Sequence, residues 1–220
     1  RYYDSLNFRH SILIGDSSSR EEYEKINHAV KDKSSRLSVQ HFYMPCLSNY
    51  DVTSKLIDNV LTPYSAFCPD DDFLVPASIE KLIAFMENNL DYSCAWGLTA
   101  MFSLEARGPY GSFQYLGPNN EATKSSIEGH TARERLIAHI DNYTSVFIGV
   151  CRTPMFKSAL RNATKLAEVS EREDNTWWTS QAFGELTTSL SLVAQGKIKS
   201  IDCLHWVRQE HPNRYLFNDA

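Results

Sequence analysis

Three consecutive carboxylates, Asp70, Asp71 and Asp72, follow a short apolar run and are the residues of this sequence best suited to chemistry. Three like charges side by side repel one another unless a cation or water neutralises them. A hard divalent ion is usually held by one or two such carboxylates, with substrate phosphates and water in its remaining positions. A solvated, exposed loop that caps the following helix would use aspartate as well. The spacing alone leaves both interpretations open.

A second acidic loop begins at Asp16, directly after the apolar run 11–15 and before three serines at 17–19. The short β-branched run predicts a buried strand. The serines and the acidic pair Glu21 and Glu22 predict a capped helix over 20–31. The sequence therefore predicts a strand, a polar loop and a helix in succession.

The rest of the chain continues this alternation. Hydrophobic periodicity predicts further strands at 37–43, 64–68, 92–97, 146–151 and 197–206, and helices at 50–60, from 76 onward, at 132–139, 153–166 and 177–192. Residues 108–121, rich in Gly, Pro and Asn, are expected to form a long loop. We expect an α/β fold with a Rossmann-like, mostly parallel central sheet flanked by helices. Ligands bind beyond the carboxyl ends of such strands, so both acidic loops should share one crevice.

Composition narrows the class of protein. The 220 residues are 42% hydrophobic and 22% charged, which is typical of a folded globule and excludes disorder. The net charge of -5, from 27 acidic and 22 basic residues, argues against nucleic acid as a partner. Five widely spaced cysteines without a CxxC pair indicate free thiols in a reducing cytosol. No apolar run could span a bilayer, so we expect a cytoplasmic protein and leave peripheral membrane association open.

The segment 64–82, YSAFCPDDDFLVPASIEKL, resembles the DxD region of GT-A-fold, family-2-like glycosyltransferases. The resemblance implies that the acidic triplet holds Mn²⁺ or Mg²⁺ against the diphosphate of a nucleotide-sugar donor. Asp72 and Asp70 would be metal ligands, and Asp70 and Asp71 would also contact the nucleotide sugar. Residues 12–19 are similar to the strand and loop in which these enzymes bind the nucleotide base. Asp16 and Ser17 would take that role, with helix capping as the alternative for Asp16.

Further resemblances lie in the second half of the chain. Glu173 and Asp174 resemble the "ED" motif that supplies the catalytic base of inverting members, although such a charged run is also typical of a solvated helix start. His211 resembles a histidine that completes the metal site in some members, with a lone surface histidine as the alternative. Arg152, Arg208 and His211 are candidates to stabilise the charge of the leaving diphosphate. Trp177 and Trp178, next to the expected base, are candidates to stack on the acceptor.

The resemblance implies a hexosyltransferase that moves a sugar from a nucleotide-diphosphate donor to a glycan or lipid-linked acceptor, in polysaccharide or glycolipid assembly. A carboxylate base is needed because a sugar hydroxyl is a poor nucleophile at neutral pH. We expect one domain over 1–220, with a nucleotide-sugar half at 1–100 and an acceptor half at 101–220. The first strand of the family's fold is expected to be missing from this sequence, so the chain would be part of a larger one.

Two alternatives come from other classes. Gly15-Asp16-Ser17 and Asp202-Cys203-Leu204-His205 resemble two sequence blocks of SGNH ester hydrolases, with Ser17 as nucleophile and Asp202 and His205 as its partners. Against this, Asp202 and His205 would point to opposite faces of the last predicted strand. The second alternative is a glycosyltransferase-like module that binds carbohydrate or a partner domain without turnover.

Overall fold

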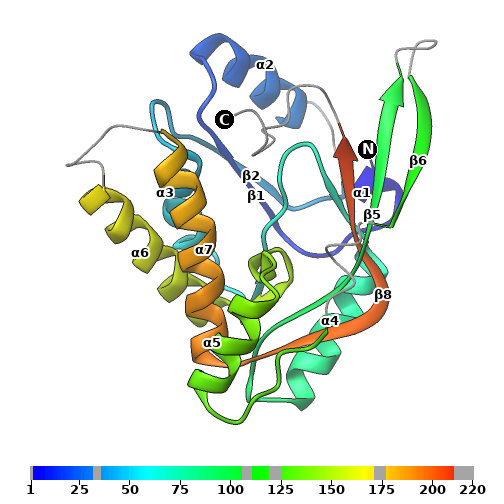
Figure 1. Ribbon diagram of the computed structural model, residues 1–220. Helices are drawn as coiled ribbons and strands as arrows, with labels where there is room; N and C mark the ends of the chain where they lie inside the picture. The colour runs from blue at the N-terminus through cyan, green and yellow to red at the C-terminus, as the bar shows by residue number, and fades with distance from the viewer. Residues whose placement is uncertain (1, 32–35, 106–110, 119–124, 171–176, 211–220) are drawn as a thin grey trace.

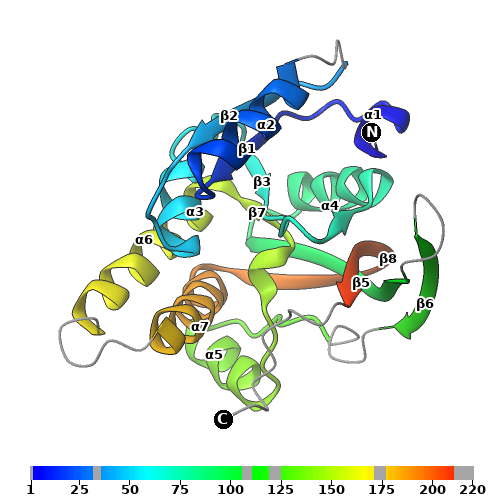
Figure 2. The same ribbon diagram turned by 90° about the horizontal axis from the view of Figure 1, so that it is seen from above.

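The computed structural model describes residues 2–31, 36–105, 111–118, 125–170 and 177–210. These residues form an α/β structure in which the long strands cross the middle of the molecule (Figures 1 and 2). Helix α4 (Pro76–Asn88) covers one face of these strands, and α5 (Ala132–Asp141) and α7 (Trp177–Gln195) lie on the other side. Within the described ranges, no helix combines the length and the apolar character needed to cross a membrane.

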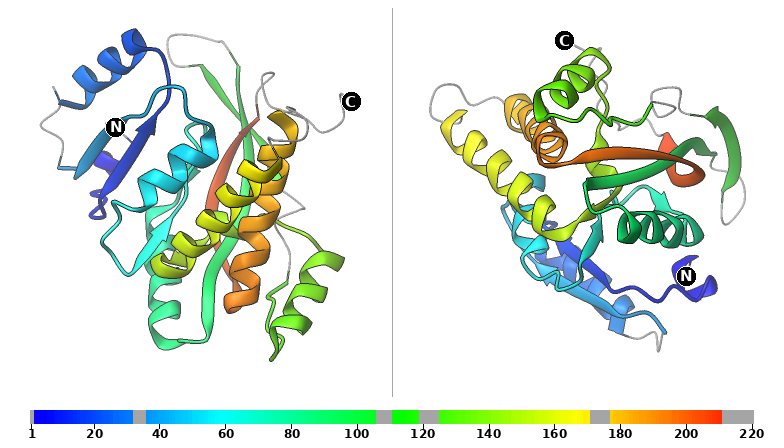
Figure 3. Two further views of the ribbon diagram at one scale, coloured as in Figure 1. Left: turned by 90° about the vertical axis from the view of Figure 1, so that its left-hand side faces the viewer. Right: turned by 90° about the horizontal axis from the view of Figure 1, so that it is seen from below.

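The N-terminal part is a strand–helix–strand unit, preceded by the single-turn helix α1 (Tyr2–Ser5). Strand β1 (Ile12–Asp16), helix α2 (Arg20–Lys31) and strand β2 (Val39–Tyr43) confirm the predicted order, and β1 and β2 pair in parallel. Helix α3 (Asn49–Ile57) packs on β1 at Gly15, where a Cβ atom would lie 2.4 Å from Cγ1 of Val52. Only glycine permits so close an approach, and this approach joins the β1–β2 pair to α3 (Figure 3).

A second, six-stranded sheet forms the main body of the protein. Its strands are β3 (Tyr64–Ala66), β4 (Phe73–Leu74), β5 (Tyr92–Glu105), β6 (Ser112–Pro118), β7 (Val150–Arg152) and β8 (Lys197–Glu210). The order is β3-β7-β5-β8-β4, and β6 also pairs with β5. Among the described residues, β1 pairs only with β2 and β3 only with β7, so each has one edge without a strand partner.

The main sheet is mixed, which corrects the expectation of a mostly parallel one. Strands β5 and β8 are parallel, whereas β3–β7, β5–β7, β4–β8 and β5–β6 are antiparallel. The connection from β7 to β8 contains two helices, α6 (Thr153–Ser170) and α7, packed side by side, and it sets the direction of β8, which runs parallel to β5 although β7 is antiparallel to β5. One crossover helix returns a chain parallel to the strand that it leaves, but a helical hairpin reverses the direction once more.

Two local predictions also need correction. Residues 112–118, expected within a long loop, form β6 and make a hairpin with the extended end of β5. Residues 146–151, expected as one strand, divide into the 3-10 helix η2 (Val146–Ile148) and the short strand β7. The predicted helices are present with small shifts of their ends; α4 begins at Pro76, and a capping box between Thr131 and Glu134 starts α5.

The core lies between the β5–β8 strands and the surrounding helices. Its fully buried side chains include Leu82, Met86, Phe156, Leu160, Leu192 and Ile198. His205 of β8 is also buried, at 1% exposure, and its Nε2 lies 3.2 Å from the carbonyl oxygen of Ile148. Burial lowers the pKa of His205 to about 4, because the surroundings disfavour the charged ring.

The buried His205 predicts a specific loss of stability in acid. Its pKa is about 4 in the folded protein against 6.5 for an ordinary histidine, so the unfolded state binds the proton first as the pH falls. Between pH 6.5 and pH 4 this difference should cost roughly 3 kcal/mol of unfolding free energy. Urea denaturation across this range should show a weaker pH dependence for His205→Gln than for wild type. The exposed-site control His130→Gln should keep the wild-type dependence; identical slopes in all three proteins would contradict the prediction.

Candidate active site

The acidic loop connects two strands of the main sheet. It begins after β3 and ends at β4, whose Phe73 and Leu74 pair with Val207 and Trp206 of β8. The loop therefore lies against the C-terminal part of β8. Of the three carboxylates, Asp70 is exposed, Asp71 is half-buried and Asp72 is buried.

Asp72 is 7% exposed, which corrects the sequence-based view of an exposed loop carboxylate. Its Oδ2 accepts a hydrogen bond of 2.8 Å from Nε1 of Trp206, and its Oδ1 accepts one of 3.0 Å from the backbone N–H of Gln209. Burial raises the pKa of Asp72 to about 6, and the neighbouring charge of Asp71 contributes. Asp72 therefore ties the loop to β8, whatever else it binds.

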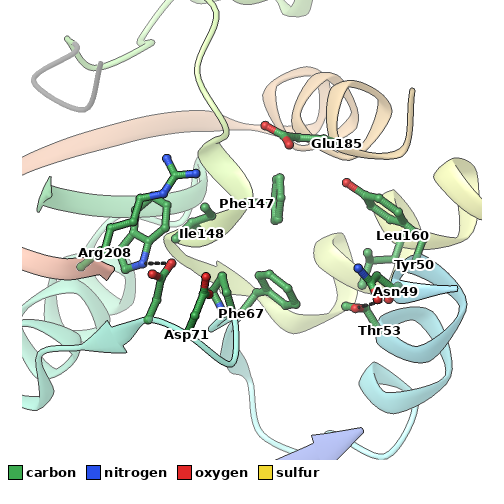
Figure 4. Close-up of a pocket in the computed structure, with 13 residues that line it drawn as sticks. Asn49, Tyr50, Thr53, Phe67, Asp71, Phe147, Ile148, Leu160, Glu185 and Arg208 are labelled. Atoms are coloured by element: carbon green, nitrogen blue, oxygen red, sulfur yellow. Dashed lines mark hydrogen bonds between the residues drawn. The ribbon is translucent and has the colours of Figure 1, made fainter. Parts of the chain in front are cut away.

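A pocket of about 260 Å³ opens beside the hydrogen bonds that join Asp72 to β8 (Figure 4). Its apolar and aromatic walls are Tyr50, Phe67, Pro69, Phe147, Ile148, Leu160 and Trp206, and its polar lining is Asn49, Thr53, Asp71, Asp72, Glu185 and Arg208. The guanidinium of Arg208 lies 5.1 Å from the centre of the Trp206 ring, a cation–π arrangement. Its positive charge partly offsets the rise in the pKa of Asp72. Aromatic faces, carboxylates and a cation around one cavity suit a polyhydroxylated, phosphate-bearing ligand.

Glu185 is the charged pocket residue that the sequence analysis missed. Its Oε1 accepts hydrogen bonds from the hydroxyl of Ser145 and, at 3.5 Å, from that of Tyr143. The helix reaches this position because residue 184 is glycine: a Cβ atom there would lie 2.7 Å from the ring of Tyr50. Burial raises the pKa of Tyr143 to about 12 and also raises that of Tyr50, with the charge of Glu185 contributing to both. A glycine inside a helix, next to the only charged residue of α7, was the available signal.

Asp16 lies in the other sheet, at the end of β1, and is not among the residues that line the pocket. Its Oδ1 accepts hydrogen bonds from the backbone N–H and the hydroxyl of Ser18, and its Oδ2 lies 2.8 Å from Nε2 of His41. Burial raises the pKa of Asp16, but these hydrogen bonds outweigh burial and hold it below the usual value. Ser17 is exposed beside it. The structure therefore does not bring the two acidic loops together around this pocket.

Arg152 is likewise away from the pocket. Its Nε donates to the carbonyl oxygen of Tyr92, and its Nη2 donates to those of Met86 and Asn89 at the C-terminal end of α4. The guanidinium also lies 5.6 Å from the centre of the Tyr64 ring. These hydrogen bonds satisfy carbonyl oxygens that the end of α4 leaves unpaired, which favours a structural role for Arg152 over diphosphate binding.

Several predicted site residues cannot be placed. Glu173, Asp174 and His211 lie outside the described residues, and Trp177 and Trp178 begin α7 without described side chains. The hydrolase alternative gains no support: within the described residues, no hydrogen bond joins Ser17, Asp202 and His205. Asp202 is exposed and His205 is buried, as opposite faces of β8 require.

The hydrogen bond between Asp72 and Trp206 of β8 predicts that two Trp→Phe substitutions lower the unfolding free energy by different amounts. Trp206→Phe removes a donor from a buried carboxylate and should lower the unfolding free energy at pH 7 by about 1.5–3 kcal/mol more than Trp96→Phe. Trp96 is the matched control, because its buried Nε1 has no hydrogen-bond partner among the described residues. Urea denaturation measures both variants. At pH 5, where Asp72 is largely protonated, the difference should shrink; equal losses at pH 7 would show that the hydrogen bond contributes nothing.

Comparison with solved structures finds proteins of similar fold. No protein-family model and no curated protein matches the chain. Among solved structures, the chain is similar to S. aureus TarS 1–349, with a TM-score of 0.55 and 14% identity over 90% of this chain and 51% of that one. The TarS structure in complex with UDP-GlcNAc gives a TM-score of 0.58 and 13% identity over 93% of this chain and 50% of that one.

The chain thus spans about half the length of the TarS structures that it matches. At such low identity the likeness establishes the fold alone. That fold is α/β and GT-A-like, with a mixed central sheet.

Proposed function

We propose that this chain is a glycosyltransferase domain that binds a nucleotide-diphosphate sugar and transfers the sugar to a hydroxyl group of a glycan or lipid-linked acceptor. The observation that carries this proposal is the pocket in which Asp71, Asp72 and Arg208 meet, in a fold shared with a glycosyltransferase. Two TarS structures are complexes, one with UDP and one with UDP-GlcNAc, which makes a uridine-diphosphate sugar the first donor to test.

The acidic loop offers a place for a divalent cation. Within the described residues, no group of three His, Cys, Asp or Glu side chains could hold a metal ion by itself. A cation that bridges to a diphosphate needs only one or two carboxylates, and Asp71 and Asp72 both line the pocket. The charge of Asp71 raises the pKa of Asp72, and a bound cation would relieve that repulsion. We therefore assign Mn²⁺ or Mg²⁺ to this pair, where it would neutralise the charge of the diphosphate; exposed Asp70 is the weaker ligand candidate.

The other pocket residues supply what the reaction needs besides a cation. The planar guanidinium of Arg208 can bind phosphate oxygens and stabilise the negative charge that the leaving diphosphate develops. Its packing on Trp206 restricts its position, since that ring is itself fixed by Asp72. Phe67 and Phe147 offer apolar faces to a sugar ring or a base. Asp16 and Ser17 as base-binding residues, His211 as a metal ligand, and Trp177 and Trp178 as acceptor-binding residues belong to the proposal as predictions.

The proposal predicts manganese-dependent donor binding through Asp71. Asp71→Asn should weaken the Mn²⁺-dependent affinity for UDP-GlcNAc about tenfold or more, because it removes one charged ligand from the cation. A half-buried side chain replaced by an amide of equal size should change the melting temperature little. Isothermal titration calorimetry with and without Mn²⁺ measures the affinity.

Asp202→Asn is the control, because this exposed carboxylate lies on β8 and does not line the pocket. It should bind the donor as the wild type does. Under the hydrolase alternative, the same variant would instead lose cleavage of ester substrates. If wild type and Asp71→Asn bind the donor with equal manganese-dependent affinity, the acidic loop is not part of the binding site.

A further inference from the structure

Glu185 is placed where a reacting hydroxyl would need a base. It is half-buried, it lines the pocket, and it is the only charged residue of α7. Figure 4 shows Glu185 on α7 and Asp71 on the acidic loop at opposite sides of the cavity, with Phe67 and Phe147 between them. A carboxylate on the wall that faces the cation and diphosphate site is the arrangement that transfer between two bound substrates requires.

The hydrogen bonds of Glu185 fix one oxygen and leave the other available. Both hydroxyl donors, Ser145 and Tyr143, bond to Oε1. Within the described residues, Oε2 accepts no hydrogen bond and Glu185 forms no ion pair. The side chain is therefore oriented by Oε1, while Oε2 keeps its lone pairs for a hydroxyl group that enters the pocket.

The groups around Glu185 leave its charge unneutralised. Tyr50 of α3 and Tyr143, which precedes η2, face it as neutral phenols with raised pKa values. Leu160 contributes an apolar surface from α6. The charged groups that share the pocket are Asp71 and Asp72 of the acidic loop and Arg208 of β8. Hence a proton can be taken up at Oε2 without the loss of an ion pair.

We propose that Glu185 is the catalytic base of the transfer, an assignment that rests on the proposed function. The acceptor oxygen forms a bond to the anomeric carbon of the donor sugar, and the hydroxyl proton moves to Oε2 of Glu185. The bond between the anomeric carbon and the diphosphate oxygen breaks, and its electron pair leaves on the diphosphate. Ser145 is a positioning residue, because its hydroxyl holds Oε1. The base is thereby assigned to α7, which lines the pocket, and no longer to Glu173 or Asp174, the residues predicted from the sequence.

The test uses turnover and binding together. Wild type is first assayed with Mn²⁺ on a panel of UDP- and GDP-sugars, with water as the acceptor, to find the donor that it cleaves fastest. Water is a suitable acceptor because the same base must take its proton. Glu185→Gln should lower kcat for that donor by about 10²-fold or more and leave its Kd unchanged. Glu87→Gln is the matched control, since Glu87 is an exposed glutamate on α4, and it should retain wild-type kcat.

A pH profile separates catalysis from a structural role. At saturating Mn²⁺ and donor, where the bound cation keeps Asp71 and Asp72 ionised, wild-type kcat should have an acidic limb that Glu185→Gln lacks and that Glu185→Asp keeps at reduced kcat. Ser145→Ala should lower kcat less than Glu185→Gln does. If Glu185 only supported the fold, Glu185→Gln would lose melting temperature and donor affinity together and would retain the acidic limb, which overturns the assignment.

The remaining outcomes distinguish the assignment from the proposed function. If Asp174→Asn abolishes turnover while Glu185→Gln retains it, the base is at the position predicted from the sequence, and the assignment is wrong. If wild type binds sugar nucleotides but never cleaves them, Glu185 is no base, and donor binding stands. If wild type binds no sugar nucleotide with Mn²⁺, the proposed function fails and the assignment fails with it.

Discussion

The site depends on the burial of one carboxylate. Removing the charge of Asp72 from water is unfavourable, and its pKa of about 6 reflects that cost. The indole N–H of Trp206 and the backbone N–H of Gln209 offset part of it, and both donors belong to β8. As long as Asp72 is ionised and buried, the acidic loop cannot separate from β8 without leaving these groups unpaired. This constraint keeps Asp71 and Arg208 in the lining of one pocket.

The helical hairpin of α6 and α7 determines both the direction of β8 and one wall of the site. Because α6 and α7 reverse the chain between β7 and β8, β8 enters the sheet parallel to β5. The same hairpin lays α7 beside the pocket, where Gly184 lets it approach Tyr50 and where Glu185 faces the cavity. With a single crossover helix, β8 would not run parallel to β5, and α7 would not line the pocket. The direction of β8 and the placement of the proposed base therefore both depend on this connection.

The sequence predicted the features that local interactions determine, namely most of the helices and where they begin. Pro76, the pair Thr131 and Glu134, and the apolar periodicity of α6 and α7 mark helices that the structure confirms. Strand β6 was missed because its flanking Gly and Pro residues indicate a loop, whereas pairing with β5 decides its conformation. The acidic loop was recognised as a site candidate, but the burial of Asp72 depends on Trp206, 134 residues away. The exposure of Glu185 to the cavity depends on α3 and η2, and Gly184 signals the close approach to α3 without identifying the partner.

The distribution of the pocket lining along the chain has a consequence for biosynthesis. The cavity walls begin at Asn49 and are complete only with Arg208, near the end of the described residues. A nascent chain that has left the ribosome only as far as α7 carries an acidic loop without its β8 partners and exposes the edge of β5 that β8 later covers. Pairing between such distant segments is slow, and the uncovered edge can associate with other chains. Recombinant production should therefore be most vulnerable to aggregation in the interval before β8 pairs with β5.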